Sequence, residues 1–106
     1  MTGQLIYLND DNFESEISKG VTLIDFYADW CGPCRMITPI VEELSKEFNG
    51  RAKIAKVDID AAQNTASNFN VTSIPTLILF KDGAEVKRVV GVRDKKTLSE
   101  MISQSL

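Results

Sequence analysis

The feature that most constrains this chain is a pair of cysteines set between an apolar segment and an amphipathic one. Residues 31–34 read Cys-Gly-Pro-Cys and hold both cysteines of the chain. Residues 21–28, just before them, are rich in β-branched and aromatic side chains with apolar groups on both faces, which predicts a central strand covered on both sides. The segment that follows predicts a helix whose apolar stripe has helical spacing and consists of Met36, Ile37, Ile40, Val41, Leu44 and Phe48. The cysteines therefore lie where a buried strand turns into a helix.

The rest of the chain also alternates between strand and helix patterns. Strands are predicted at residues 5–8, 53–59, 76–80 and 84–90, and helices at residues 9–20, 61–69 and 94–102, with start signals at Asn9, Asp10, Asp11 and Asp94. The Asp82-Gly83 pair predicts a tight hairpin turn. The order βαβαβαββα predicts an α/β fold with a mixed sheet, because strand–helix–strand units are parallel and a hairpin is antiparallel. No linker or repeat interrupts the chain, so residues 1–106 are expected to form a single domain.

Charge and composition exclude several functions. The net charge of −3 gives no long-range attraction to nucleic acid or to anionic lipid. No apolar run reaches the length of a membrane span, and the first residues lack a signal-peptide pattern, so we expect a cytoplasmic protein. The absence of histidine excludes Cys–His catalysis and histidine metal sites. The chain shows no dinucleotide-binding glycine motif, and we expect it to bind no cofactor.

The two cysteines could be structural or redox-active. They could be core residues, they could contribute two of the four ligands of a zinc site shared with a second chain, or they could form a structural disulfide worth roughly 2 kcal/mol. A strand–CxxC–helix setting favours redox chemistry. Pro33 suits the first turn of a helix, which would place Cys31 at the positive helix end, where the thiolate is favoured. Cys34 would lie within reach but further inside, so one sulfur can attack an external disulfide and the other can resolve it.

Four other residues are ambiguous from the sequence pattern alone. Asp25 has apolar neighbours on both sides, which favours burial and a raised pKa for its carboxyl group. Lys56 is expected to face solvent, and Pro75 is expected to follow an ordinary trans peptide bond. Trp30 could be a core residue, as large aromatic side chains usually are.

Beyond the cysteines, several segments resemble the thioredoxin family and together cover nearly the whole chain. They are DFYADWCGPC at residues 25–34, Pro39, KVDID at 56–60, SIPTLILFKDG at 73–83, and Val90-Gly91. Two positions depart from the usual pattern: Tyr27 stands where many members have tryptophan, and Arg35 where lysine is usual. The resemblance implies the thioredoxin fold, a central mixed five-stranded sheet flanked by four helices.

The resemblance also implies roles for residues around the cysteines. Asp25 would lie buried behind the cysteines and accept the proton of Cys34, with Lys56 as its charge partner. Pro75 would be cis and packed against the cysteine pair, helping to exclude metal ions. The backbone of residues 74–76 would pair with an extended substrate segment. The substrate-docking surface would comprise Trp30, Gly32, Pro33, Ile74, Pro75, Thr76, Gly91 and Val92.

The function implied is that of a general protein-disulfide reductase and electron carrier. The substrates would be disulfide-containing proteins, and an NADPH-dependent thioredoxin reductase would restore the dithiol. The Gly-Pro pair between the cysteines is typical of reductants in this superfamily, and we expect a monomer. An alternative of another class is that the chain is a redox-independent binding subunit of a second protein. In that case the cellular function would survive replacement of Cys31 and Cys34 by serine.

Overall fold

Nine secondary-structure elements follow one another in the predicted order along residues 5–106, which are the residues that the computed structural model describes. The elements are β1 (Ile6–Leu8), α1 (Phe13–Ile17), β2 (Val21–Tyr27), α2 (Gly32–Glu47), β3 (Lys53–Asp58), α3 (Gln63–Asn68), β4 (Thr76–Lys81), β5 (Ala84–Val90) and α4 (Lys95–Ser103). Most predicted bounds are correct to within one or two residues.

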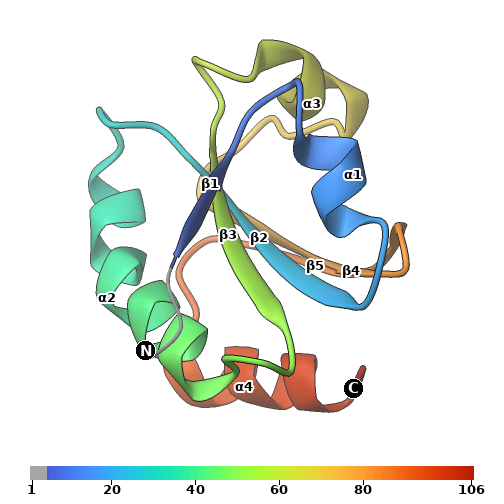
Figure 1. The fold of residues 1–106 in the computed structure, drawn as a ribbon. Coiled ribbons are helices and arrows are strands. Elements are labelled where there is room, and N and C mark those ends of the chain that lie inside the picture. Colours follow the sequence, from blue (N-terminus) through green and yellow to red (C-terminus); the bar gives the residue numbers. More distant parts are fainter. Residues whose placement is uncertain (1–4) are drawn as a thin grey trace.

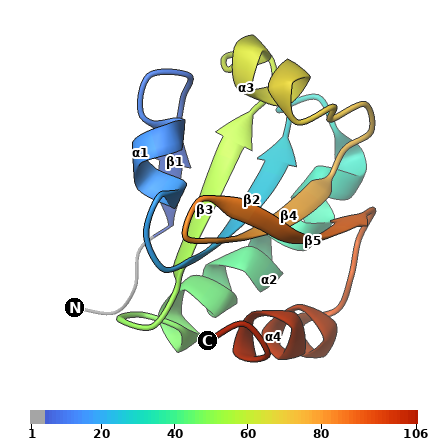
Figure 2. The ribbon, with the colours of Figure 1, turned by 90° about the vertical axis from the view of Figure 1, so that its right-hand side faces the viewer.

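The five strands form one mixed sheet in the order β1-β3-β2-β4-β5 (Figures 1 and 2). Strands β1, β3 and β2 are parallel, whereas β4 is antiparallel to β2 and β5 is antiparallel to β4. The predicted α/β class and five-stranded mixed sheet are confirmed. Because β2 has a neighbour on each side, the segment that follows its carboxyl end emerges from the middle of the sheet.

Helices cover both faces of the sheet, with α2 and α4 on one side and α1 and α3 on the other (Figure 1). The alternation of side chains along β2 explains this arrangement: Leu23 faces α2 and α4, whereas Ile24 and Phe26 face α1. On the second face, the ring of Phe13 contacts those of Phe26, Phe69 and Phe80. Burial on both faces explains why β2 is almost uniformly apolar.

One residue of the predicted apolar stripe of α2 is misplaced. Ile37, Val41, Leu44 and Phe48 are fully buried, as predicted. Met36 is 67% exposed, so its assignment to the core was wrong. The error arises because Met36 lies at the edge of the stripe, on the same side of the helix as Ile40, which is only half-buried.

Asp94 caps α4 as predicted, with its carboxylate accepting a hydrogen bond from the Thr97 N–H at 2.9 Å. The helix-start residues predicted at 9–11 divide between two other helices. Asn9 accepts hydrogen bonds from the backbone N–H groups of Asp11 and Asn12 at the entry to α1. Asp10 instead accepts hydrogen bonds from the backbone N–H and the hydroxyl of Thr65, at 2.8 and 2.7 Å, in the first turn of α3. Asp10 therefore ties α3 to the loop after β1, a role that its position in the sequence did not predict.

The hairpin between β4 and β5 has the predicted tight turn. Asp82 and Gly83 both have positive φ angles, of 50° and 88°, which is the combination that two-residue hairpin loops favour. The Asp82 carboxylate also accepts a 2.8 Å hydrogen bond from the backbone N–H of Gly20.

Replacing Gly83 by alanine tests the requirement for this turn. The added Cβ would meet no atom closer than 3.9 Å, so the effect comes from the backbone conformation alone. We expect a loss of about 1 kcal/mol in the free energy of unfolding, measured by urea denaturation. Gly32→Ala is the matched control, because its Cβ would enter open space and its φ is not positive. An unchanged Gly83→Ala stability would contradict the strain argument.

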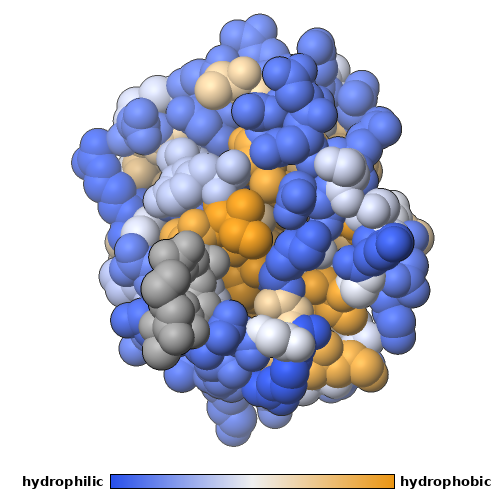
Figure 3. All heavy atoms as spheres, viewed as in Figure 1, coloured by the Kyte–Doolittle hydropathy of each residue, from blue (hydrophilic) through white to orange (hydrophobic). Residues whose placement is uncertain are grey.

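Polar side chains cover most of the face that carries β1, and apolar residues reach the surface there in a central strip between α1 and α2 and in a second patch at the lower right (Figure 3). Within residues 5–106, no helix has the length and apolar character needed to cross a bilayer. The same residues bring no three metal-ligating side chains together.

Candidate redox site

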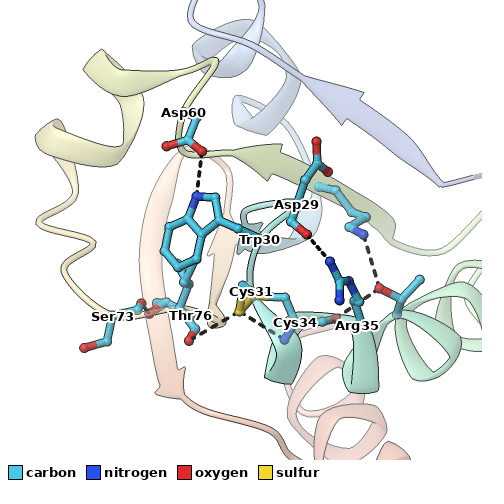
Figure 4. The surroundings of a disulfide bond; sticks show 11 residues. Asp29, Trp30, Cys31, Cys34, Arg35, Asp60, Ser73 and Thr76 are labelled. Atoms are coloured by element: carbon cyan, nitrogen blue, oxygen red, sulfur yellow. Dashed lines mark hydrogen bonds between the residues drawn. A yellow bond between two sulfur atoms is a disulfide. The ribbon is translucent and has the colours of Figure 1, made fainter.

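The two cysteines lie where β2 gives way to α2. After β2 the chain turns back, with the backbone N–H of Cys31 donating to the carbonyl of Ala28 at 3.2 Å. Cys31 is the N-cap of α2 and has an extended backbone, and Pro33 lies in the first turn. Cys31 and Cys34 form a disulfide with their Cα atoms 5.3 Å apart (Figure 4). The structure thus confirms the predicted strand–cysteine–helix arrangement and pairs the two sulfurs.

The start of α2 provides hydrogen-bonding groups suited to a sulfur anion. The backbone N–H of Cys34 donates a hydrogen bond to Sγ of Cys31 at 3.1 Å. The first turn of α2 contains no acidic residue. A thiolate at Cys31 would therefore be stabilised by this N–H group and by the positive end of the helix dipole. Arg35 adds a positive charge nearby, fixed by its hydrogen bond to the carbonyl of Asp29 (Figure 4).

The expected difference in exposure between the two cysteines is not present in the disulfide form. Cys31 and Cys34 are 4% and 3% exposed, so both are buried. Ile59 and Ile74 pack against this pair. The prediction that Cys34 lies clearly further inside was therefore wrong for this state, because segments distant in sequence cover both sulfurs.

The Ile74–Pro75 peptide bond is cis and lies beside the disulfide. The sequence pattern alone favoured trans, whereas the family resemblance implied cis. The carbonyl oxygen of Ile74 lies 3.9 Å from Sγ of Cys31. Pro75 is itself held by a 2.8 Å hydrogen bond from the Gly91 N–H to its carbonyl. Thr76 is buried, and its hydroxyl donates to the carbonyl of Ser73 (Figure 4).

The surface around the disulfide is partly apolar and open. Trp30 is 66% exposed, so the core alternative is wrong, and its indole N–H donates to the carboxylate of Asp60 at 2.9 Å (Figure 4). Gly32, Pro33 and Val92 are also exposed, whereas Ile74 and Gly91 are half-buried. Two residues here were not predicted: Asp60, which binds the indole of Trp30, and the exposed Met36 of α2. The three-residue spacing of Pro33 and Met36 on a helix was the signal that could have placed Met36 here.

Asp25 is fully buried on β2, as its apolar neighbours predicted. Neither carboxylate oxygen has a hydrogen-bond partner among the described residues. Burial raises the pKa of Asp25 from 3.8 to about 6, and the positive charge of Lys56 opposes part of that rise. Asp25 can therefore gain or lose a proton near neutral pH.

Lys56 is buried, at 6% exposure, so the solvent-facing alternative is wrong. It pairs with Asp25 in the register of β2 and β3. Its ammonium group nevertheless makes no ion pair with Asp25 among the described residues, and lies 4.1 Å from the centre of the Tyr27 ring. Lys56 thus acts on Asp25 through its charge rather than through a direct contact.

The family model for thioredoxin matches residues 4–104. This chain belongs to the thioredoxin family. It is 49% identical to the thioredoxin of Staphylococcus saprophyticus over 102 residues, which cover 96% of this chain and 98% of that protein. It is 48% identical to the thioredoxin of Staphylococcus haemolyticus and 46% identical to that of Staphylococcus aureus, with the same coverage.

Membership of the thioredoxin family fixes the chemistry of the cysteine pair. The protein is a protein-disulfide oxidoreductase that cycles between the dithiol and the disulfide of Cys31 and Cys34. Its substrates are, in general terms, disulfide-containing proteins, and its electrons come from a reductase.

Proposed function

We propose that this thioredoxin is a general disulfide reductase in which Cys31 attacks and Cys34 resolves. The Cys31 thiolate attacks one sulfur of a target disulfide, and the other target sulfur leaves as a thiolate. The Cys34 thiolate then attacks Sγ of Cys31 in the mixed disulfide and releases the first target sulfur. Two electrons pass to the target, which becomes a dithiol, and Cys31 and Cys34 become the disulfide.

The observation that carries this assignment is the hydrogen bond from the Cys34 N–H to Sγ of Cys31. Cys31 is the N-cap of α2, so its sulfur lies at the unpaired N–H end of the helix, whereas Cys34 lies inside the first turn. The thiolate is the attacking species in disulfide exchange, so the better-stabilised sulfur is the better candidate for the first step.

Asp25 is the proposed acceptor of the Cys34 proton. It lies on β2, the strand that leads into the cysteines, and on the face that α2 covers. Its carboxyl pKa of about 6 suits a base that works near neutral pH. Lys56 is proposed to favour the charged form of Asp25 through its nearby positive charge.

The proposed docking surface for the target comprises the residues around the disulfide that the sequence singled out. It includes Trp30, Gly32, Pro33, Ile74, Pro75, Thr76, Gly91 and Val92. Extended target segments would pair with the backbone at residues 74–76 in the manner of an added strand. We further propose a monomeric, single-domain protein that works in the cytoplasm and is recharged by an NADPH-dependent thioredoxin reductase.

Alkylation of the reduced protein tests the assignment of the attacking sulfur. At pH 7, iodoacetamide is expected to modify Cys31 roughly tenfold faster than the thiol of an unstructured cysteine peptide, because the helix end favours its thiolate. Cys34 should react much more slowly, as mass spectrometry of the digested protein would show. If Cys34 were labelled before Cys31, Cys34 would be the attacking cysteine. If Cys31 and the peptide reacted at equal rates, the helix end would not favour the Cys31 thiolate, and the assignment would lose its electrostatic basis.

A further inference from the structure

A row of three polar side chains crosses the face of the sheet that α2 covers. In the strand register, Lys56 of β3 lies between Tyr7 of β1 and Asp25 of β2. Tyr27 lies two residues after Asp25 on β2 and therefore on the same face. The backbone position of Lys56 therefore allows its side chain to reach either the carboxylate of Asp25 or the aromatic rings of Tyr7 and Tyr27.

The ammonium group of Lys56 lies with the rings. It is 4.1 Å from the centre of the Tyr27 ring and 5.9 Å from that of Tyr7, both within the range of a cation–π interaction. It also donates a 3.4 Å hydrogen bond to the hydroxyl of Thr38, which in turn donates to the carbonyl of Cys34 at 3.1 Å. These contacts come from β1, β2 and α2, and they engage the ammonium on several sides.

The carboxylate of Asp25 is left without a partner as a consequence. Both of its oxygens are buried and make no hydrogen bond among the described residues. Lys56 is the charged neighbour that acts on Asp25. On the other side, the residue of β4 paired with Asp25 is the apolar Leu77. The Cys34 thiol on α2 is the further titratable group once the disulfide is reduced. A carboxylate and an ammonium on neighbouring strand positions attract each other, so the rings compete with Asp25 for the lysine.

We propose that Tyr27 is a positioning residue, which, together with Tyr7, holds the Lys56 ammonium away from Asp25 and thereby keeps the Asp25 carboxyl ready to take up a proton. Three observations support it: the distances from the ammonium to the rings, the burial of Lys56 and the unpartnered carboxylate of Asp25. The electrostatic reason is direct, because an ammonium in contact with Asp25 would favour the charged carboxylate more strongly than one at a distance.

This inference deepens the proposed role of Asp25 as the proton acceptor and rests on it for its catalytic meaning. Burial of the ring, followed by the negative charges of Asp58 and Asp29, raises the pKa of the Tyr27 phenol to about 12. The ring therefore stays neutral in the working range of Asp25. It presents an uncharged π face to Lys56 throughout that range.

An NMR titration of the oxidised protein tests the proposal by following the Asp25 carboxyl carbon. In Tyr27→Leu, which removes the π face, Lys56 is free to approach Asp25, and the titration midpoint is expected to fall by about one pH unit. Tyr27→Phe keeps the ring and is expected to leave the midpoint unchanged. Tyr7→Leu, at a site that is 61% exposed, should fold without difficulty and shift the midpoint in the same direction by less.

The same titration in a Lys56→Met background separates the proposal from a simple change in solvent exposure. If Tyr27 acts through Lys56, then adding Tyr27→Leu to Lys56→Met moves the midpoint no further. A shift of equal size in both backgrounds, or no shift in Tyr27→Leu alone, would overturn the inference. Because the oxidised protein performs no thiol exchange in this measurement, the result does not depend on whether Asp25 is the catalytic base.

Discussion

Replacing Cys31 by serine is expected to lower the rate of insulin reduction at least about a thousandfold, to the background set by dithiothreitol alone. A serine hydroxyl is scarcely ionised at neutral pH, and the hydrogen bond from the Cys34 N–H cannot compensate for that. The remaining Cys34 lies inside the first turn of α2 rather than at its N-cap, so it lacks the position that stabilises a thiolate at Cys31 and is the poorer nucleophile. The onset of insulin turbidity measures the effect.

Cys34→Ser is the matched variant, because it keeps the attacking sulfur and removes the resolving one. This variant should attack a target once and then remain covalently joined to it. The mixed disulfide should be visible on a non-reducing gel and should disappear when excess dithiothreitol reduces it. If Cys31→Ser formed the stable mixed disulfide instead, Cys34 would be the attacking cysteine and Cys31 the resolving one. Survival of the cellular function in both serine variants would point to the redox-independent binding role.

Most of the fold could be predicted from the sequence because its signals are local. Apolar runs, helical spacing and the Asp82-Gly83 pair each determine an element, and the rules for strand–helix–strand units then limit how the strands are ordered. The first helix was the least accurate, predicted at 9–20 and observed as Phe13–Ile17. The third helix was predicted at 61–69 and is observed as Gln63–Asn68. Its start depends on hydrogen bonds from Asn64 and Thr65 to Asp10, a residue far away in the sequence, and no local pattern reports such a contact.

The site divides in the same way between local and distant causes. The helix-end position of Cys31 and the burial of Asp25 follow from neighbouring residues and were predicted from them. The burial of Lys56 depends on the rings of Tyr7 and Tyr27, which the strand order brings to it. The isomer at Pro75 and the cover over the cysteines likewise depend on segments brought together only by folding, and the family resemblance, not the pattern, anticipated the isomer.

The buried carboxylate of Asp25 is expected to make the oxidised protein less stable as the pH rises. Its pKa is 3.8 when exposed and about 6 in the folded protein, so the folded state holds the proton more tightly. Stability from this group is fully present below the lower value and is lost as the pH rises through the higher one. The shift of about two units corresponds to about 3 kcal/mol.

Asp25→Asn removes this dependence while keeping the shape of the side chain. The free energy of unfolding of the variant, relative to the unaltered oxidised protein, should therefore rise by about 3 kcal/mol between about pH 3.5 and about pH 7.5. Urea denaturation across that range measures the difference, and taking the difference cancels the opposite trend of Glu47 and Glu85, whose pKa values are lowered by hydrogen bonds from Lys95 and Arg88. A flat difference for Asp25→Asn would mean that the carboxyl group is solvated in solution, and the proton-acceptor role would lose its physical basis.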